Sequence, residues 1–490
     1  MAAIPALNPL KIRTNYTNGE TIEGFKKGDI DHEQPLSPMS RLFHEPGSNV
    51  YIVGIIGLKT KIQPDIFKHN LVHTFLKNHR FSSLQVTNKQ NGSMKWIPTH
   101  VNIDDHVFVA QIDPNMESSD KFVEDFISNL SRSPIESTKP LWDLHILDLK
   151  TSEAEGTCVF RFHHSLGDGV SLMNLLLSCT RKASDPKALP TLPGSIKKSG
   201  AADVSSFWSR FGVLWNSFVA LVMFVSTILF LEDTKTPMKG SKGVEHRPRR
   251  FVIKNVSLDD IKLVKTAMNV TINDVVVGVT QAGFYRYLHR RYCEGDTENT
   301  NIPDNIRLRS TLFFNLRATT KIEDVTDTSR HGTWGNKIGY ALHPFKIGPR
   351  KDPLDYVRDA KAVMDRKKAS LEPLFTYFFA NLVLKLFGMK VAGKLNHKVF
   401  YNTTLWFSNV PGPQEEISFF GHEVAYIAPS CYGQPNALMI HVVSYVDKLT
   451  FVISADEETI PNPHELCHDL EESLRIIKAS VCSSGIMSKY

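Results

Sequence analysis

The chain has 490 residues, of which 42% are hydrophobic and 22% charged, and its formal net charge is +6 at pH 7. This composition is typical of a folded globular protein and excludes a disordered or low-complexity chain. The length exceeds what one core ordinarily supports and predicts two or three domains. The mild basic excess is compatible with an anionic membrane surface or a phosphorylated ligand, and we expect no nucleic-acid partner.

The cysteines carry no disulfide or metal signature. No CxxC pair and no metal-ligand spacing connects them, so we expect reduced thiols that act as small apolar residues in a cytosol-facing protein, and no metal site. The first twenty residues lack the continuous apolar region of a secretory signal, so no cleaved leader is expected. The six cysteines are Cys158, Cys179, Cys293, Cys431, Cys467 and Cys482.

The first half predicts one α/β domain over residues 35–181, after a polar, turn-rich arm over residues 1–34. Apolar residues at strand or helix spacing indicate the elements of this domain. They are strand 50–56, helix 65–78, a hairpin over 80–96, helix 122–130, strands 140–147 and 157–162, and helix 170–179. His145 is expected to be a structural polar residue of its strand, with an approach to a functional site as the alternative.

One motif, HHSLGDG from His163 to Gly169, lies between the last of these strands and the apolar helix that follows. Imidazoles at the end of a buried strand are held rigidly and can still face a cleft. Histidine titrates close to neutrality and is the usual group that removes a proton from a hydroxyl or thiol. A pair of histidines alone also suits a metal half-site or a buried polar pair. The whole pattern HHxxxDG between a strand and a helix favours catalysis.

Residues 182–249 read as a linker that contains a strongly apolar helix at 211–231. Sixteen of its twenty-one residues are apolar and none is charged, so the helix could span about 30 Å of membrane. A single span would place the two halves of the chain in different compartments, so we favour a monotopic or interfacial helix, with a buried helix as the third alternative. The basic stretch 235–250 is either a solvated linker or a contact with anionic lipid. One helical face suited to rest on protein contains Gly212, Asn216, Ala220, Met223 and Thr227.

The second half predicts another α/β domain over residues 250–490. Thr271 and Asp274 have capping-box spacing ahead of a long helix. The helix over 371–398 is unusually apolar. The expected elements are strand 250–253, helices 258–268 and 275–292, strand 311–317, a turn at 334–340, helices 354–369 and 371–398, strand 404–409, a hairpin over 437–454 and helix 463–479.

Seven motifs together resemble the plant branch of the wax ester synthase/diacylglycerol acyltransferase family. They extend from residue 35 almost to the C-terminus, and the DFGWG signature of the plant soluble acyltransferases is missing from the sequence. The resemblance implies an α/β fold of two chloramphenicol acetyltransferase-like domains that pack face to face around a central tunnel. The motifs are PLSPMSRLF, PLWDLHIL, HHSLGDG, TINDVVVGV, the NLR that ends at Arg317, WGNKIGY and SNVPGP.

The same resemblance assigns roles within the HHSLGDG motif. His164 is implied to be the general base, which takes the hydroxyl proton of an alcohol and then protonates the leaving CoA thiolate. His163 is expected to pack and to support the turn. Asp168 is expected to hold the loop through an ion pair with an arginine, unless it orients an imidazole, and Gly169 to allow the turn.

Three further residues are candidates for substrate binding. Asn273 could donate to the thioester oxygen or simply cap its helix, and Arg317 and Asn409 are expected on the tunnel side. The implied co-substrate is acyl-CoA, with no resident cofactor.

The predicted reaction esterifies long-chain fatty alcohols to wax esters, with diacylglycerol acyltransferase side activity. Two alternatives stay open: diacylglycerol as the main acceptor, and a non-catalytic scaffold that binds acyl chains. The apolar segments predict contact with a membrane lipid surface. We expect location on the endoplasmic reticulum membrane, with the site open to the cytosol, and the plasma membrane as a second location.

Overall fold

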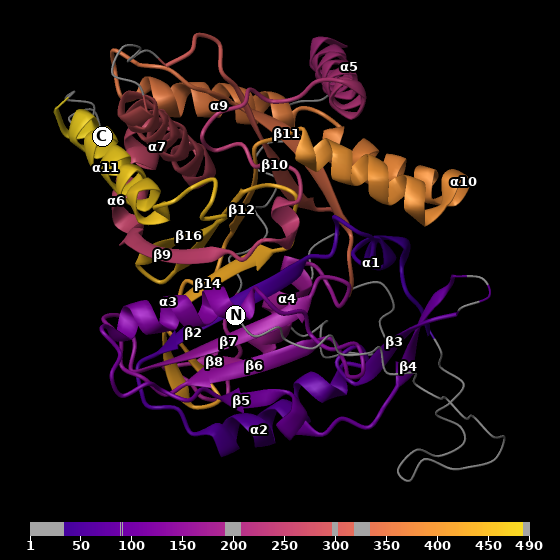
Figure 1. The fold of residues 1–490 in the computed structure, drawn as a ribbon. Helices are drawn as coiled ribbons and strands as arrows, with labels where there is room; N and C mark the ends of the chain where they lie inside the picture. The colour runs from indigo at the N-terminus through magenta and orange to yellow at the C-terminus, as the bar shows by residue number, and fades with distance from the viewer. Residues whose placement is uncertain are drawn as a thin grey trace, which may run out of the picture.

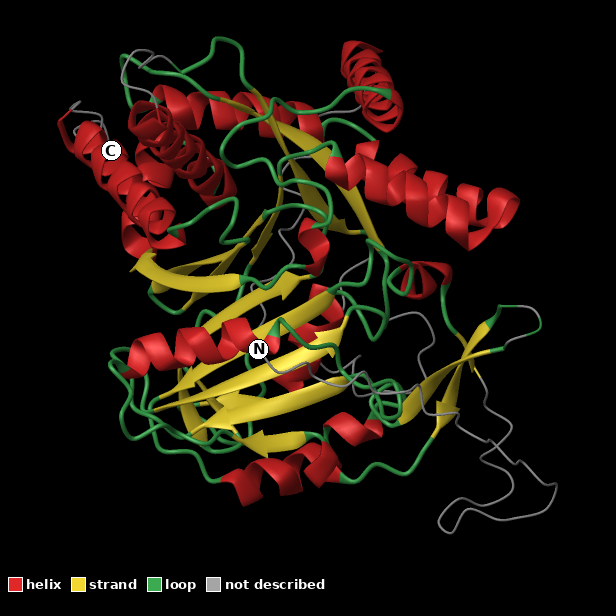
Figure 2. Cartoon of the chain, viewed as in Figure 1, coloured by secondary structure: helices red, strands yellow, loops and turns green. Residues whose placement is uncertain are grey.

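Two large sheets organise the computed structural model, which describes residues 34–88, 90, 92–191, 207–295, 302–317 and 334–483 (Figure 1). One sheet has seven strands in the order β5-β6-β7-β2-β14-β13-β8, and the other has six in the order β11-β10-β12-β15-β16-β9. Figure 2 shows helices on the outer sides of both sheets. The arm predicted over 1–34, apart from its last residue, and residues 192–206 of the linker lie outside the described residues.

The seven-stranded sheet contains the predicted strand pair that leads to the motif. Its strands are β2 (Tyr51–Leu58), β5 (Val107–Val109), β6 (Trp142–Leu147), β7 (Gly156–His163), β8 (Thr180–Lys182), β13 (Ile417–Phe419) and β14 (His422–Tyr432). Its helices are α2 (Pro64–His73), α3 (Ser119–Leu130) and α4 (Gly169–Ser178). Aromatic side chains fill the core beneath it, among them Phe75, Phe160 and Trp142, each at most 1% exposed.

Two strands of this sheet come from the second half of the chain. β14 pairs antiparallel with β2, and β13 joins β14 to β8. The predicted boundary at residue 250 is therefore wrong for residues 417–432, which complete the first domain. The sequence analysis predicts no strand over these residues, and membership of a sheet depends on long-range pairing that periodicity does not determine.

The six-stranded sheet carries most of the second half. Its strands are β9 (Arg250–Ser257), β10 (Arg307–Asn315), β11 (Ile338–Lys346), β12 (Leu405–Val410), β15 (Leu438–Tyr445) and β16 (Lys448–Ala455). Its helices are α6 (Leu258–Met268), α7 (Ile272–Gly295), α9 (Asp355–Lys368) and α11 (Pro463–Ser483). The valines of α7 lie at the centre of this core. The predicted capping box is present, since Thr271 and Asp274 bond each other's backbone N–H groups.

Short elements complete the first domain. They are β1 (Gln34–Pro35), β3 (Ser83–Thr87), β4 (Met94–Pro98), helix α1 (Pro38–Leu42) and 3₁₀ turns at Phe75–Lys77, Ile103–Asp105 and Val244–His246. β3 and β4 form the hairpin predicted over 80–96. His145 lies against Asp143, with Nε2 3.2 Å from Oδ1, and does not line the central cavity.

Two apolar helices, α5 (Phe207–Leu229) and α10 (Glu372–Tyr401), lie together at one edge of the molecule (Figure 1). α5 contacts the protein through Ala220, Phe224 and Thr227, which are at most 4% exposed. Two members of the predicted face are wrong: Met223 is 36% exposed, and a side chain at Gly212 would meet nothing within 4 Å.

The helix predicted over 371–398 is two helices that fold back on each other. Gly388 has φ 77° and ψ 179°, which interrupts α10. The Thr376 hydroxyl donates to the Tyr340 carbonyl at 2.9 Å, and the Phe400 ring lies 5.2 Å from the Tyr340 ring. In one straight helix, residues 376 and 400 would be about 36 Å apart, so they could not both contact Tyr340. The first and second arms of α10, 372–387 and 389–401, therefore form a V with Gly388 at its tip.

Candidate active site

The HHSLGDG motif forms the predicted strand–turn–helix. β7 ends at His163, and α4 begins at Gly169. Asp168 caps α4, since its carboxylate accepts from the Ser171 N–H at 3.0 Å. The role expected for Gly169 is not supported, because its φ is not positive and a Cβ there would meet no atom within 4 Å. The close approach is at Gly167, whose Cβ would lie 3.2 Å from the Ser171 side chain.

Asp168 also fastens the turn to the second half of the chain. Its carboxylate accepts from Arg317 Nη1 at 2.6 Å and from the Lys337 N–H at 3.1 Å, and Arg317 further donates to the Gly335 carbonyl. The side chains of Asp168 and Arg317 are only 2% and 4% exposed. A buried ion pair of this geometry needs both partners. The arginine expected to pair with Asp168 is thus Arg317, whose guanidinium contacts the protein itself.

His164 faces the central cavity. Its backbone is fixed on both sides: its N–H donates to the Val50 carbonyl at 2.9 Å, and its carbonyl accepts from the Asn336 amide at 2.8 Å. Its ring stacks on Phe43 with centroids 4.0 Å apart. Within the described part of the chain, Nδ1 has no hydrogen-bond partner. A rigid backbone and a ring that lines the cavity are suited to proton transfer.

Burial lowers the pKa of His164 to about 4, and its own carbonyl, Asp168 and the Asn336 amide offset this only in part. Desolvation disfavours the charged imidazolium. The ring is therefore neutral at pH 7, which is the form that a general base requires.

His163 points away from the cavity. Its Nδ1 lies 2.6 Å from the Ser165 hydroxyl and its Nε2 2.9 Å from the Asn49 side-chain oxygen. The residue is 1% exposed and is not among the cavity-lining residues. Both ring nitrogens contact the protein, so His163 holds the turn in place, in agreement with the expected packing role.

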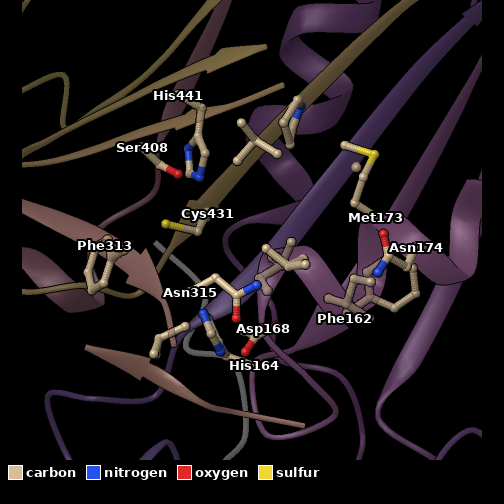
Figure 3. Close-up of a pocket in the computed structure, with 18 of the residues that line it drawn as sticks. Phe162, His164, Asp168, Met173, Asn174, Phe313, Asn315, Ser408, Cys431 and His441 are labelled. Atoms are coloured by element: carbon tan, nitrogen blue, oxygen red, sulfur yellow. The ribbon is translucent and has the colours of Figure 1, made fainter. Parts of the chain in front are cut away.

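The cavity has a volume of about 880 Å³ and lies between the two domains. Residues of β2, β7 and α4 line it from the first domain, and residues of β10, β12, β15 and α10 from the second. Figure 3 shows His164 and Asp168 on one side and Phe313, Ser408 and His441 toward the other. The lining is mainly apolar, with a few polar groups, as in pockets that bind small molecules.

The three substrate-binding candidates occupy different places. Asn409 lines the cavity, and its amide donates to the Asn273 side-chain oxygen at 3.1 Å. Asn273 is not among the lining residues, and its helix is capped by Thr271 instead. The structure brings Arg317 and Asn409 to the cavity and places Asn273 behind Asn409.

The sequence analysis missed His441, on β15. It lines the cavity, and its Nδ1 has no hydrogen-bond partner among the described residues. Burial, and to a lesser degree His164, lowers its pKa to about 3. The available signal was a single polar residue inside the apolar run LMIHVV. A lone histidine in a strand gives no direction for its side chain, so the signal was weak.

These features define a class of protein: a two-domain α/β fold with a shared, largely apolar central cavity that two histidines, His164 and His441, line. The comparison with solved structures agrees. The chain superposes on the wax ester synthase/diacylglycerol acyltransferase from Marinobacter aquaeolei VT8 with a TM-score of 0.59, at 18% identity over 92% of this chain and all of that one. It superposes on the starter condensation domain of rhizomide synthetase RzmA with a TM-score of 0.53, at 12% identity over 93% and 96% of the two chains. These likenesses show the fold.

Sequence comparison shows the family. Residues 67–276 match the wax ester synthase/diacylglycerol acyltransferase catalytic domain, and residues 334–478 match the WS/DGAT C-terminal domain. Wax ester synthase/diacylglycerol acyltransferase 4 of Arabidopsis thaliana is 45% identical over 94% of this chain and 93% of its own, and number 11 is 46% identical over 93% and 96%. The chain belongs to the wax ester synthase/diacylglycerol acyltransferase family and is an acyltransferase.

Proposed function

We propose that the chain esterifies long-chain fatty alcohols with acyl-CoA to form wax esters, with diacylglycerol as a weaker acceptor. The observation that carries this proposal is a neutral, cavity-facing His164 at the centre of a largely apolar space lined by both domains. The names of the relatives combine wax ester synthase with diacylglycerol acyltransferase. The acyl donor is supported by the matched condensation domain, which was solved in complex with C8-CoA.

The chemistry follows from the position of His164. Its imidazole takes the hydroxyl proton of the alcohol as the oxygen attacks the thioester carbonyl. The C–S bond then breaks, and the imidazolium returns the proton to the CoA thiolate. No covalent acyl-enzyme is needed, because the cavity holds both substrates next to the base.

Two other cavity residues are placed to position the reacting groups. The Asn409 amide is oriented by its bond to Asn273. His441, which approaches from β15, offers a neutral imidazole without a protein partner at Nδ1 among the described residues. Donors held in a dry cavity stabilise the oxyanion that develops on a thioester carbonyl. We assign Asn409 and His441 to this part of the site.

The proposed location is the cytosolic side of the endoplasmic reticulum membrane. Two of the described helices, 211–229 and α10, are long and apolar enough to cross a membrane by length and composition. Long-chain alcohols and diacylglycerol partition into membranes, whereas acyl-CoA is available from the cytosol.

The test is an acyltransferase assay on membranes from cells that lack their own neutral-lipid synthesis, with labelled palmitoyl-CoA and either hexadecanol or diacylglycerol. We expect wax ester as the main product, and its loss in His164→Ala. Triacylglycerol as the main product would replace the proposed acceptor by diacylglycerol. No His164-dependent product with either acceptor would contradict the proposed reaction.

A further inference from the structure

The edge formed by α5 and α10 exposes many large apolar side chains. Those of α5 that are at least half exposed include Leu214, Trp215, Phe218 and Leu229, and Phe230, directly after the helix, is also exposed. Those of α10 are Phe378, Leu382, Leu386 and Phe387, between 53% and 65% exposed. Isolated exposed apolar residues are ordinary, but a contiguous surface of this kind marks an interaction site.

The contacts of α5 exclude a transmembrane span for this helix. Near its middle, the Ser217 hydroxyl accepts from the Leu371 N–H at 2.9 Å. Near its end, the Thr227 hydroxyl accepts from Arg309 at 2.6 Å, and the Thr227 carbonyl accepts from the Asn402 amide at 2.6 Å. A spanning helix would leave the protein body over about 30 Å, whereas α5 is fastened to it at its middle and at its end.

The end of α5 is held by a buried ion pair. Arg309 Nε lies 2.6 Å from Asp233 Oδ1, and both side chains are at most 2% exposed. Arg309 also donates to the Leu231 carbonyl at 2.9 Å. Pulling α5 into a membrane would break this arrangement and leave a buried charge without its partner, which is strongly unfavourable.

α10 is not a span either, because it turns back at Gly388. Lys385 and Lys390 lie three and two residues from this tip, and both are exposed. Charged ammonium groups stay at the level of lipid headgroups and water. The tip therefore fits the boundary between headgroups and acyl chains and not the centre of a bilayer.

The charge of the edge indicates its partner. Between residues 373 and 414 the sequence contains no acidic residue, while α10 exposes Lys385, Lys390, Lys394 and Lys398. Apolar side chains next to lysines fit the interface of an anionic leaflet. A second copy of this chain would bring the same lysines together in a symmetric contact, which is unfavourable.

We propose that α5 and the V of α10 together form a monotopic docking surface for an anionic phospholipid leaflet, at the depth of the interface. The second arm of α10 also lines the cavity with Asn396 and Phe400. The docked leaflet thus lies next to the wall of the site, and a lipid acceptor would have only a short way to travel. This last step rests on the proposed function, while the docking surface does not.

The test is vesicle flotation of the full chain carrying His164→Ala, without substrates, so that its result is independent of turnover. Vesicles are phosphatidylcholine alone or with one quarter phosphatidylserine. We expect the double variant Leu386→Glu with Phe387→Glu to lose on the order of 100-fold in partitioning. Phe218→Glu should also weaken binding. The control is Val86→Glu on β3, an apolar position that is 41% exposed and lies outside this edge, which should float like the parent.

The lysines are tested separately. A triple variant with Lys385→Gln, Lys390→Gln and Lys394→Gln should partition on the order of 100-fold less onto vesicles that contain phosphatidylserine. It should then show no preference for these vesicles over phosphatidylcholine alone. A bimane label on Phe387→Cys should report a shallow depth in one leaflet. Flotation of all variants like the parent, with unchanged melting temperatures, would overturn the proposal. So would a label accessible from the far side, or a changed oligomeric state with unchanged flotation, which would indicate a second copy.

Discussion

The turn over residues 164–168 and the edge formed by α5 and α10 differ in how their side chains find partners. At the turn, Asp168 has partners on three segments of the chain. At the edge, apolar side chains such as Phe378 and Phe387 are about two-thirds exposed. Both regions are rich in residues that indicate function, but the first is organised from within the protein and the second requires an outside partner.

This difference predicts how substitutions in each of the two regions should affect the protein. Changes at the turn act on catalysis or on folding, because its groups are buried and shared between domains. Changes at the edge should leave both largely intact in solution, because few contacts are lost. The following predictions test this division.

The largest effect is expected from His164→Gln. Loss of the general base should lower acyltransferase activity about 10²- to 10⁴-fold, with little change in melting temperature. The measurement is product formation with palmitoyl-CoA and hexadecanol beside a thermal melt. A variant that keeps more than a tenth of the activity would show that His164 is not the base.

The ion pair between Arg317 and Asp168 is tested by Arg317→Ala. This change leaves the Asp168 carboxylate buried and unpaired, which should cost about 3–5 kcal/mol of stability. Denaturant unfolding measures the loss. Arg317→Lys is the control that keeps the charge, and it should restore part of the stability. Unchanged unfolding of the alanine variant would show that this ion pair does not stabilise the fold.

Acidification should destabilise the folded chain. Burial lowers the pKa of His164 to about 4 and the pKa values of His343 and His441 to about 3. Below about pH 6.5 the unfolded chain binds protons that these folded histidines do not, so stability falls as the pH falls. The loss between pH 7 and 5.5 is about 1 kcal/mol per histidine.

Denaturant unfolding at the two pH values measures this loss. His343→Leu should reduce this loss by about 1 kcal/mol, whereas an equal pH dependence in this variant would show that His343 is already charged in the folded state.

The smallest effect is expected at the edge. Phe387→Ala should change stability by no more than about 0.5 kcal/mol. Phe400→Ala, on the other arm of the same element and 6% exposed, should cost about 3–5 kcal/mol. Chemical unfolding of the pair in detergent-free buffer compares them directly. Equal losses would mean that the tip of α10 also packs in the folded state.

Local sequence predicted most of the helices and many of the strands, because apolar periodicity is a local property, but no strand was predicted at β11, β13 or β14. The turn of HHSLGDG, the capping box at Thr271 and the hairpin of β15 and β16 are all present. The V of α10 was missed because Gly388 also fits inside a helix, and only the contacts of Tyr340 with both arms reveal the fold-back. Both arms are apolar, so hydropathy averaged along the sequence indicates one continuous helix.

The site was predicted where residues adjoin in sequence and missed where they meet across domains. His164 and Asp168 belong to one short motif. His441 reaches the cavity through the pairing of β15 with β12 and β16, which periodicity does not determine. The family resemblance pointed to Arg317, but only the contact at 2.6 Å shows that it pairs with Asp168.

Because β13 and β14 belong to the first sheet, that sheet can be completed only late in the synthesis of the chain. During synthesis, β2 emerges from the ribosome long before β14, its partner over eight register positions. Until then one side of β2 is an unpaired strand edge, which invites association with other chains. A fragment that ends at residue 249 should therefore aggregate, although it carries the whole motif. The nascent first domain should depend on chaperones until residue 432 has been made.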